Sequence, residues 1–130
     1  AERCLDSDNE RVIMSGGLNF VRDFVDVRDA AAAVQLMLKG QPCSEQAYEF
    51  YNICSGIPTK INDIITLLRE LVGFGFEVRE KTLLENYSEI VESYGSYEKI
   101  KQKYKWEPQI PLRQSARDTF EYWMKRLKES

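Results

Sequence analysis

Two hydrophobic periods alternate along this chain, and each is typical of a different backbone structure. In the longer runs, apolar side chains recur three and four residues apart, as on the buried face of a helix. In the shorter runs, apolar and polar residues alternate, as in a strand with one buried face. The sequence therefore predicts an α/β (α+β) fold in which short strands pack with about four helices. Its 130 residues suffice for a single domain over 1–130.

The expected helices are bounded by residues that commonly begin or end a helix. The first should run from a cap at Asp26 to about Leu38 and stop at Gly40. Three more are predicted over 61–72, 96–104 and 111–126. Strands are predicted over 12–14, 21–27, 48–54 and 76–80, with another short strand inside the loop 81–95. In the last helix, we expect Phe120 and Trp123 to pack into the core.

Composition excludes several classes of partner. The net charge of −3 argues against a nucleic-acid surface, which needs an excess of Lys and Arg. No apolar run approaches the roughly 20 residues that span a bilayer, so no membrane partner is expected. The cysteines Cys4, Cys43 and Cys54 are odd in number and widely spaced, and no signal peptide is visible. These features favour a reducing, cytoplasmic location, and cysteines that either serve packing or are inert surface thiols.

The chain contains no histidine, which excludes a Ser-His-Asp triad and any His-ligated metal site. Tyr97 and Lys101 match the Tyr-x-x-x-Lys spacing of short-chain dehydrogenases, in which the lysine lowers the phenol pKa. We interpret this match as accidental because Lys and Glu crowd residues 97–105. The glycine pair of 73–75 also lacks the third glycine of a dinucleotide fingerprint and follows a helix instead of a strand. No catalytic, cofactor-binding or metal-binding residue is therefore predicted.

Arg22 is the first candidate for binding a ligand. It lies on a predicted strand just after the glycines 16–17, where a planar guanidinium could hold a phosphate with two hydrogen bonds. The alternative is an ion pair with Asp23, Asp26 or another neighbour. In the loop, Glu89 and Glu92 could bind a ribose diol or could be solvated surface acids.

The segment VRDFVDVRD at 21–29 resembles the Arg-Asp-(aromatic)-x-x-Val-x-Asp motif of extended short-chain dehydrogenase/reductases that act on nucleotide sugars. Residues 51–56, 95–100, 105–108 and 111–126 follow in the family's order. They resemble its Tyr-Asn-Val-x-Ser-Gly, Gly-Asp-x-Ser-Lys-Leu, Gly-Trp-x-Pro and final-helix motifs. Each motif is weak alone, but five in the right order and spacing are specific. Within the family, the segments are most similar to those of GDP-4-keto-6-deoxy-D-mannose reductases, followed by GDP-mannose 4,6-dehydratases.

The resemblance implies the smaller, C-terminal substrate-binding domain of an NAD(P)-dependent dehydratase or reductase of deoxysugar biosynthesis. The family's Rossmann domain, which binds NAD or NADP and carries the catalytic Tyr and Lys, is absent from the sequence. We therefore expect no cofactor in this chain and no catalysis by it alone. A nucleotide sugar, preferably a GDP-hexose, is the expected ligand. The surface that the Rossmann domain covers would be exposed and partly apolar, which favours homo-oligomers.

The resemblance also carries over individual residues. Arg22 occupies the position of the family's pyrophosphate-binding arginine, and Gly17 precedes it in the matching segment. The family's second arginine aligns with Asn86, and the acid that follows it aligns with Glu89. Asn86 cannot supply a cationic fork, so this departure weakens phosphate binding, signals a different nucleotide sugar, or shifts the alignment of the loop. Lys60 replaces a serine cap, so the helix from residue 61 should fray or be capped otherwise.

The predicted substrate-binding residues are therefore Gly17, Arg22, Asn86 and Glu89. Three alternatives stay open. The parent could be an epimerase or dehydratase acting on UDP, CDP or dTDP sugars. The chain could be an autonomous, non-catalytic module that binds sugar nucleotides, or a structural domain without a ligand.

Overall fold

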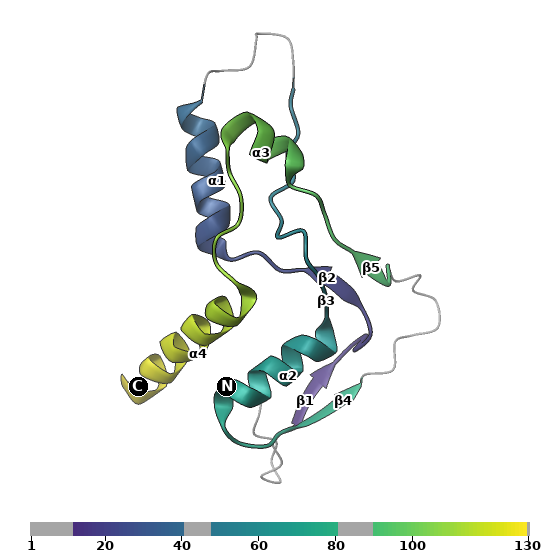
Figure 1. The fold of residues 1–130 in the computed structure, drawn as a ribbon. Coiled ribbons are helices and arrows are strands. Elements are labelled where there is room, and N and C mark those ends of the chain that lie inside the picture. The colour runs from purple at the N-terminus through teal and green to yellow at the C-terminus, as the bar shows by residue number, and fades with distance from the viewer. Residues whose placement is uncertain (1–11, 41–47, 81–89, 130) are drawn as a thin grey trace.

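A computed structural model describes residues 12–40, 48–80 and 90–129. Its elements are β1 (Val12–Ser15), β2 (Val21–Asp23), α1 (Val27–Lys39), β3 (Pro58–Lys60), α2 (Ile61–Val72), β4 (Glu77–Glu80), β5 (Glu92–Ser93), α3 (Glu98–Tyr104) and α4 (Leu112–Glu129). Four helices with short strands confirm the predicted mixed α/β class. Figure 1 shows α1 and α3 side by side at one end and α2 beside β1 and β4 at the other, with β2 and β3 between them.

The described strands form two small sheets. β1 pairs with β4 in parallel, with Val12 opposite Glu77. In the second sheet β2 is central, antiparallel to β3 and parallel to β5. Each of its ladders is only two or three residue pairs long. Such short strands need support from outside the ladder, because isolated pairs of strands are marginally stable in water.

The main core joins α1 to α3 and the turn that follows α3. Ala33, Ile100 and Trp106 are almost completely buried there. The ring of Tyr97 packs edge-on against Trp106 at 6.0 Å between centroids. The Trp106 indole N–H donates to the backbone oxygen of Asp29 at 3.0 Å, so the buried polar atom of this ring is satisfied.

The first turns of α1 and α2 are satisfied in different ways, one by a local cap and the other by a distant loop. The Asp26 carboxylate accepts from the backbone N–H of Arg28 at 2.8 Å and caps α1 as predicted. Lys60 provides no side-chain cap for α2. The backbone N–H groups of Ile61 and Asn62 donate instead to the carbonyls of Phe20 and Leu18, both at 3.0 Å. The loop before β2 thus satisfies the first turn of α2, which is the second of the two expected outcomes.

Two strand predictions were wrong. The strand predicted over 21–27 ends at Asp23, because Asp26 already caps α1 and Val27 is helical. Residues 48–54 are not a strand, since they pair with no strand in the described part of the chain. The backbone of this segment is instead contacted by a side chain, since Lys99 Nζ donates to the Phe50 carbonyl at 2.8 Å. The short strand β3 was not predicted, because Pro58 indicated only a turn.

The packing of α4 also differs from the prediction. No α4 residue within 112–129 is buried, and the side chain of Trp123 is 52% exposed instead of lying in the core. An ion pair between Arg113 of α4 and Glu70 of α2, at 2.8 Å, links the two helices. Because no residue of α4 is buried, the described residues cover its apolar face only in part. An amphipathic pattern predicts an apolar face but does not show what covers it.

Candidate functional site

Arg22 lies in the middle of β2, and its guanidinium contacts the neighbouring backbone. Nη1 donates to the carbonyl oxygens of Val21 at 2.8 Å and of Val91 at 3.2 Å. The guanidinium carbon lies 5.2 Å from the centre of the Phe20 ring. No carboxylate within the described ranges pairs with Arg22, so the ion pair left open by the sequence is not seen there. A guanidinium has five N–H donors, and those on Nη2 and Nε have no hydrogen-bond partner among the described residues.

Gly17 supports Arg22 through Phe20. Gly17 is buried with φ of +55°, and a Cβ at this position would come within 2.1 Å of the Phe20 ring. The Phe20 backbone N–H donates to the Gly17 carbonyl at 2.8 Å, which closes the turn before β2. Only glycine combines this backbone conformation with so close a ring. A direct contact of Gly17 with substrate stays a prediction.

Asp23 connects three segments that are distant in sequence. Its Oδ1 accepts from the Ser55 backbone N–H at 2.6 Å and from the Ser55 hydroxyl at 2.7 Å. Its Oδ2 accepts from the N–H groups of Gly56 at 2.9 Å and Gly95 at 3.3 Å. Burial by itself would raise the pKa of this carboxyl, but the bonds from Ser55, Gly95 and Gly56 together outweigh it and lower the pKa.

The other candidate ligand residues belong to the loop of 81–95, of which residues 90–95 are described. Asn86 and Glu89 lie outside the described residues, so their predicted roles stay untested. Glu92 lies in β5 with an exposed side chain, and its backbone position is opposite Val21 in the parallel ladder. Of the predicted ligand residues, Gly17 and Arg22 both contact the Phe20 ring, so the structure places these two close together.

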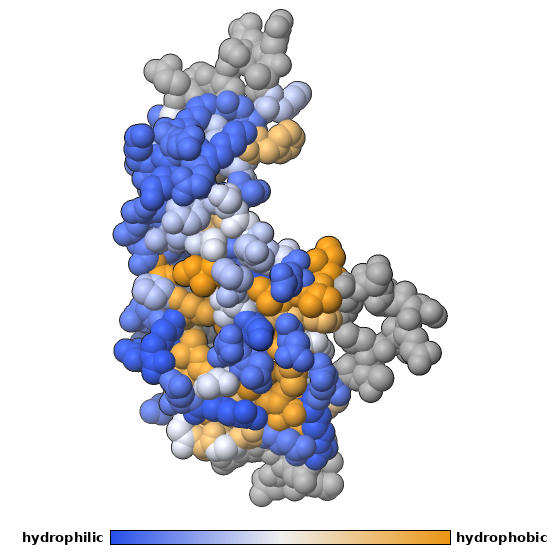
Figure 2. All heavy atoms as spheres, turned by 45° about the vertical axis from the view of Figure 1, so that its right-hand side comes forward, coloured by the Kyte–Doolittle hydropathy of each residue, from blue (hydrophilic) through white to orange (hydrophobic). Residues whose placement is uncertain are grey.

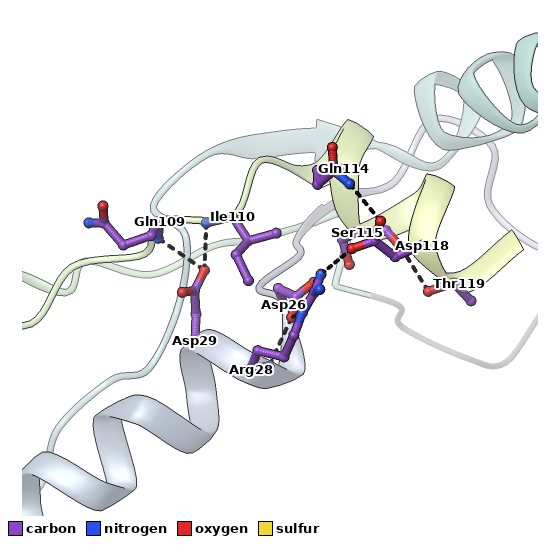
Figure 3. Close-up of polar contacts among 9 residues, drawn as sticks. All are labelled: Asp26, Arg28, Asp29, Gln109, Ile110, Gln114, Ser115, Asp118 and Thr119. Atoms are coloured by element: carbon purple, nitrogen blue, oxygen red, sulfur yellow. Dashed lines mark hydrogen bonds and ion pairs between the residues drawn. The ribbon is translucent and has the colours of Figure 1, made fainter. Parts of the chain in front are cut away.

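A second polar cluster surrounds the start of α1 (Figure 3). Arg28 binds the Asp26 carboxylate through Nε at 2.9 Å and Nη2 at 2.8 Å, and Nη2 also pairs with Asp118 of α4 at 2.7 Å. These bonds from Arg28 hold the pKa of the Asp26 carboxyl far below its ordinary value. Asp29 Oδ2 accepts from the backbone N–H groups of Gln109 at 3.0 Å and Ile110 at 2.8 Å. The cluster therefore joins α1 to α4 and to the segment before it.

A cavity of about 480 Å³ opens beside this cluster, between the first turn of α1 and α4. Its lining includes Arg28, whose guanidinium is paired with two carboxylates. Its apolar lining residues are Val27, Tyr122 and Trp123. Because one guanidinium faces two carboxylates in this lining, the cavity is less suited to an anionic ligand than Arg22 is.

The Tyr97–Lys101 pair serves packing and surface charge. Tyr97 contacts Trp106 in the core, and Lys101 Nζ forms an ion pair with Glu107 at 2.7 Å. The Cys54 thiol is buried against Gly95, where a Cβ would come within 2.8 Å of the sulfur. Burial raises the pKa of this thiol, so the protonated, unreactive form is favoured. Cys4 and Cys43 lie outside the described residues.

Sequence reasoning missed the roles of Asp23 and Asp29. The sequence suggested Asp23 only as a possible ion-pair partner of Arg22, and it suggested no separate role for Asp29. The available signal was the set of small residues, Ser55, Gly56 and Gly95, that allow backbone N–H groups to approach a carboxylate.

No family model matches the chain. A curated relative, GDP-6-deoxy-D-mannose reductase of Pseudomonas aeruginosa, is 30% identical over 115 residues, which cover 88% of this chain and 36% of the relative. A structure of RMD from Pseudomonas aeruginosa complexed with NADPH matches with a TM-score of 0.77 and 26% identity, covering 96% of this chain and 39% of that one. UDP-glucose 4-epimerase of Thermotoga maritima, solved with UDP-glucose, matches with a TM-score of 0.75 and 32% identity, covering 97% of this chain and 38% of that one.

The chain belongs to the extended short-chain dehydrogenase/reductase family. Within this nucleotide-sugar-modifying family it corresponds to the C-terminal part of the enzymes. It spans little more than a third of the length of the relatives it matches, 36% to 39%. No helix in the described part of this chain is long and apolar enough to cross a membrane.

Proposed function

We propose that the chain is the part of an NAD(P)-dependent nucleotide-sugar enzyme that binds the sugar nucleotide, with a GDP-hexose as the preferred ligand. The observation that supports this proposal is Arg22. Its guanidinium is fixed on β2 by two backbone carbonyls and has no carboxylate partner among the described residues. A cation held in place by neutral oxygens keeps its charge for an anionic ligand, and a pyrophosphate matches the planar fork.

We propose that the nicotinamide cofactor binds a part of the enzyme outside this chain. The residues present do not fit a dinucleotide, because the glycine pair of 73–75 follows α2 instead of a strand. The chain's own contribution would be to hold and orient the sugar nucleotide, which raises a reaction rate through proximity. By itself the chain should then be catalytically inactive. A cytoplasmic location accords with this proposal.

The exposed face of α1 supports contact with such a further part of the enzyme. Val27, Val34 and Leu38 are 77%, 46% and 81% exposed, and their spacing places them in one stripe along the helix. This stripe lies on a different face from the buried Ala33. On the face shown in Figure 2, apolar residues also gather over the middle and lower parts of the molecule. Relatives more than twice as long as this chain supply an occupant for such surface.

Isothermal titration calorimetry with GDP-mannose tests the role of Arg22. The Arg22→Ala variant should bind on the order of tenfold more weakly, because charge-assisted hydrogen bonds to phosphate are lost. Arg113→Ala is the matched control, since it removes an exposed arginine that already pairs with Glu70 of α2. Equal dissociation constants for wild type and Arg22→Ala would refute the assignment of Arg22.

Competition among sugar nucleotides tests the choice of base. GDP-mannose should displace UDP-glucose and dTDP-glucose from the chain at lower concentration. The Thermotoga maritima structure that contains UDP-glucose makes a uridine nucleotide the most informative competitor. A preference for UDP-glucose would place the chain with the epimerases and contradict the GDP-hexose proposal.

A further inference from the structure

Arg22 lies on a strand that is too short to fix the position of the guanidinium by strand pairing alone. β2 has three residues, and its ladder with β5 contains two pairs, Val21 with Glu92 and Arg22 with Ser93. One of the two carbonyls that hold the guanidinium belongs to Val91, immediately before β5. The location of the guanidinium therefore depends on how β2 and β5 are aligned. Two residue pairs are too few to ensure that alignment.

The carboxylate of Asp23 anchors both neighbours of β2. Ser55 and Gly56, which it holds through three hydrogen bonds, lie three and two residues before β3. Gly95, which it holds through a fourth, lies two residues after β5. The side chain that follows Arg22 along the chain thus connects the two strands on either side of Arg22.

The local sequence is suited to this arrangement. Gly56 has φ of +73°, and a Cβ there would come within 3.2 Å of the Tyr97 ring. At Gly95 a Cβ would come within 2.8 Å of Cys54 Sγ. Glycine at both positions lets the two backbone N–H groups reach the same oxygen of Asp23. An ionised carboxylate accepts about four hydrogen bonds, which matches the four donors present.

We propose that Asp23 is the positioning residue for Arg22: by fixing the segments before β3 and after β5, its carboxylate sets where the guanidinium meets a phosphate. The proposal rests on the phosphate-binding role proposed for Arg22. It assigns Asp23 no contact with the ligand, since its described bonds all go to Ser55, Gly56 and Gly95.

The Asp23→Asn variant of the 130-residue chain tests the proposal. An amide keeps the size of the side chain but presents an NH₂ group toward one pair of donors, so about half of the bonds are lost. The first readout is the nitrogen-15 spectrum of the side-chain Nε–Hε of Arg22, assigned with Arg22→Lys and recorded without ligand. The second is the dissociation constant for GDP-mannose. Asp63→Asn, which makes the same chemical change at an exposed site in α2, is the control.

We expect Asp23→Asn to shift the Arg22 signal and to weaken binding of GDP-mannose on the order of tenfold, while Asp63→Asn changes neither. An unchanged Arg22 signal in a folded Asp23→Asn variant would overturn the proposal, even with the amide signals of Ser55, Gly56 and Gly95 displaced. If Asp23→Asn does not fold, Ser55→Ala decides. It removes the hydroxyl's bond to Asp23 at 2.7 Å, together with the bond that the hydroxyl accepts from the Ile57 N–H at 3.1 Å, and leaves the backbone donors to Asp23 in place. It should shift the Arg22 signal by a smaller amount, and no shift would count against the proposal.

The two proposals can fail separately. If wild type binds no sugar nucleotide, the proposed function fails, and the ligand-free Arg22 signal still decides whether Asp23 positions it. If wild type binds and Arg22→Ala weakens binding but Asp23→Asn changes neither readout, only the positioning role is refuted.

Discussion

Single carboxylates hold this molecule together over long distances in sequence. Asp23 joins β2 to the segments around Ser55 and Gly95, and Asp29 joins α1 to Gln109 and Ile110. In each case backbone N–H groups of irregular segments donate to a side chain. Those segments have no ladder or helix to satisfy their donors, so a carboxylate replaces the missing regular partner.

The turn at Gly17 provides a prediction at the same scale. Gly17→Ala should lower the free energy of unfolding by roughly 1–3 kcal/mol, because φ is positive and the Phe20 ring occupies the space of a Cβ. Gly73→Ala is the matched control, since φ there is +69° but nothing lies within 4 Å of a Cβ. Urea denaturation should show the larger loss for Gly17→Ala. Equal losses would mean that the close approach of the Phe20 ring adds nothing to the destabilisation caused by the positive φ.

The carboxyls of Asp23 and Asp26 predict how stability depends on pH. Both have a pKa lowered in the folded chain. Their contribution is therefore complete above the unfolded value, near pH 4, and is lost as the pH falls toward the folded values. The midpoint of urea unfolding should drop between about pH 4 and pH 2. Asp26→Asn, which can still cap α1, should flatten this drop, and an identical pH profile in that variant would contradict the assignment.

At the scale of elements, the loop before β2 supports both the first turn of α2 and the candidate phosphate site. α2 begins at Lys60 without a side-chain cap, and carbonyls of the loop before β2 satisfy its first N–H groups. The same loop places Phe20 against Arg22. A change in that loop should therefore affect both α2 and the candidate phosphate site.

The contact between α1 and the segment before α4 can be tested with Asp29→Ala. The variant leaves the backbone N–H groups of Gln109 and Ile110 without their acceptor, which should cost roughly 1–3 kcal/mol of unfolding free energy. Asp63→Ala removes an exposed acid from α2 and should have a small effect. Urea denaturation of both variants makes the comparison. A loss at Asp29 no greater than at Asp63 would show that these donors find other partners.

At the scale of the whole molecule, the main core is small and much apolar surface is exposed. The α1 stripe of Val27, Val34 and Leu38 lies beside the buried face of the helix and not within it. Tyr48 and Phe50, on the extended segment of 48–54, are 95% and 84% exposed. Together with the length of the relatives, these exposures support the proposal that another part of the enzyme covers some of this surface.

Sedimentation velocity of the isolated chain tests this proposal about the α1 stripe. Without the covering part, wild type should self-associate as its concentration rises, because the exposed stripe is apolar. Val34→Glu should shift the population toward monomer, since a buried unpaired charge opposes association. Ala32→Glu adds the same charge to another exposed face of α1 and should leave the association unchanged. Equal masses for the two variants would exclude the stripe as the associating surface.

The sequence by itself determined the helices, the mixed α/β class and the family, because helix periodicity, caps and motif order are local properties of the chain. It also located Arg22 and the cap at Asp26. Only the tertiary structure decided that residues 48–54 pair with no described strand, that Trp123 is half exposed, and that Asp23 holds Ser55, Gly56 and Gly95. A strand needs a neighbour, burial needs a covering surface, and a carboxylate needs donors from distant segments. Each of these depends on which segments meet in space, which local sequence patterns do not specify.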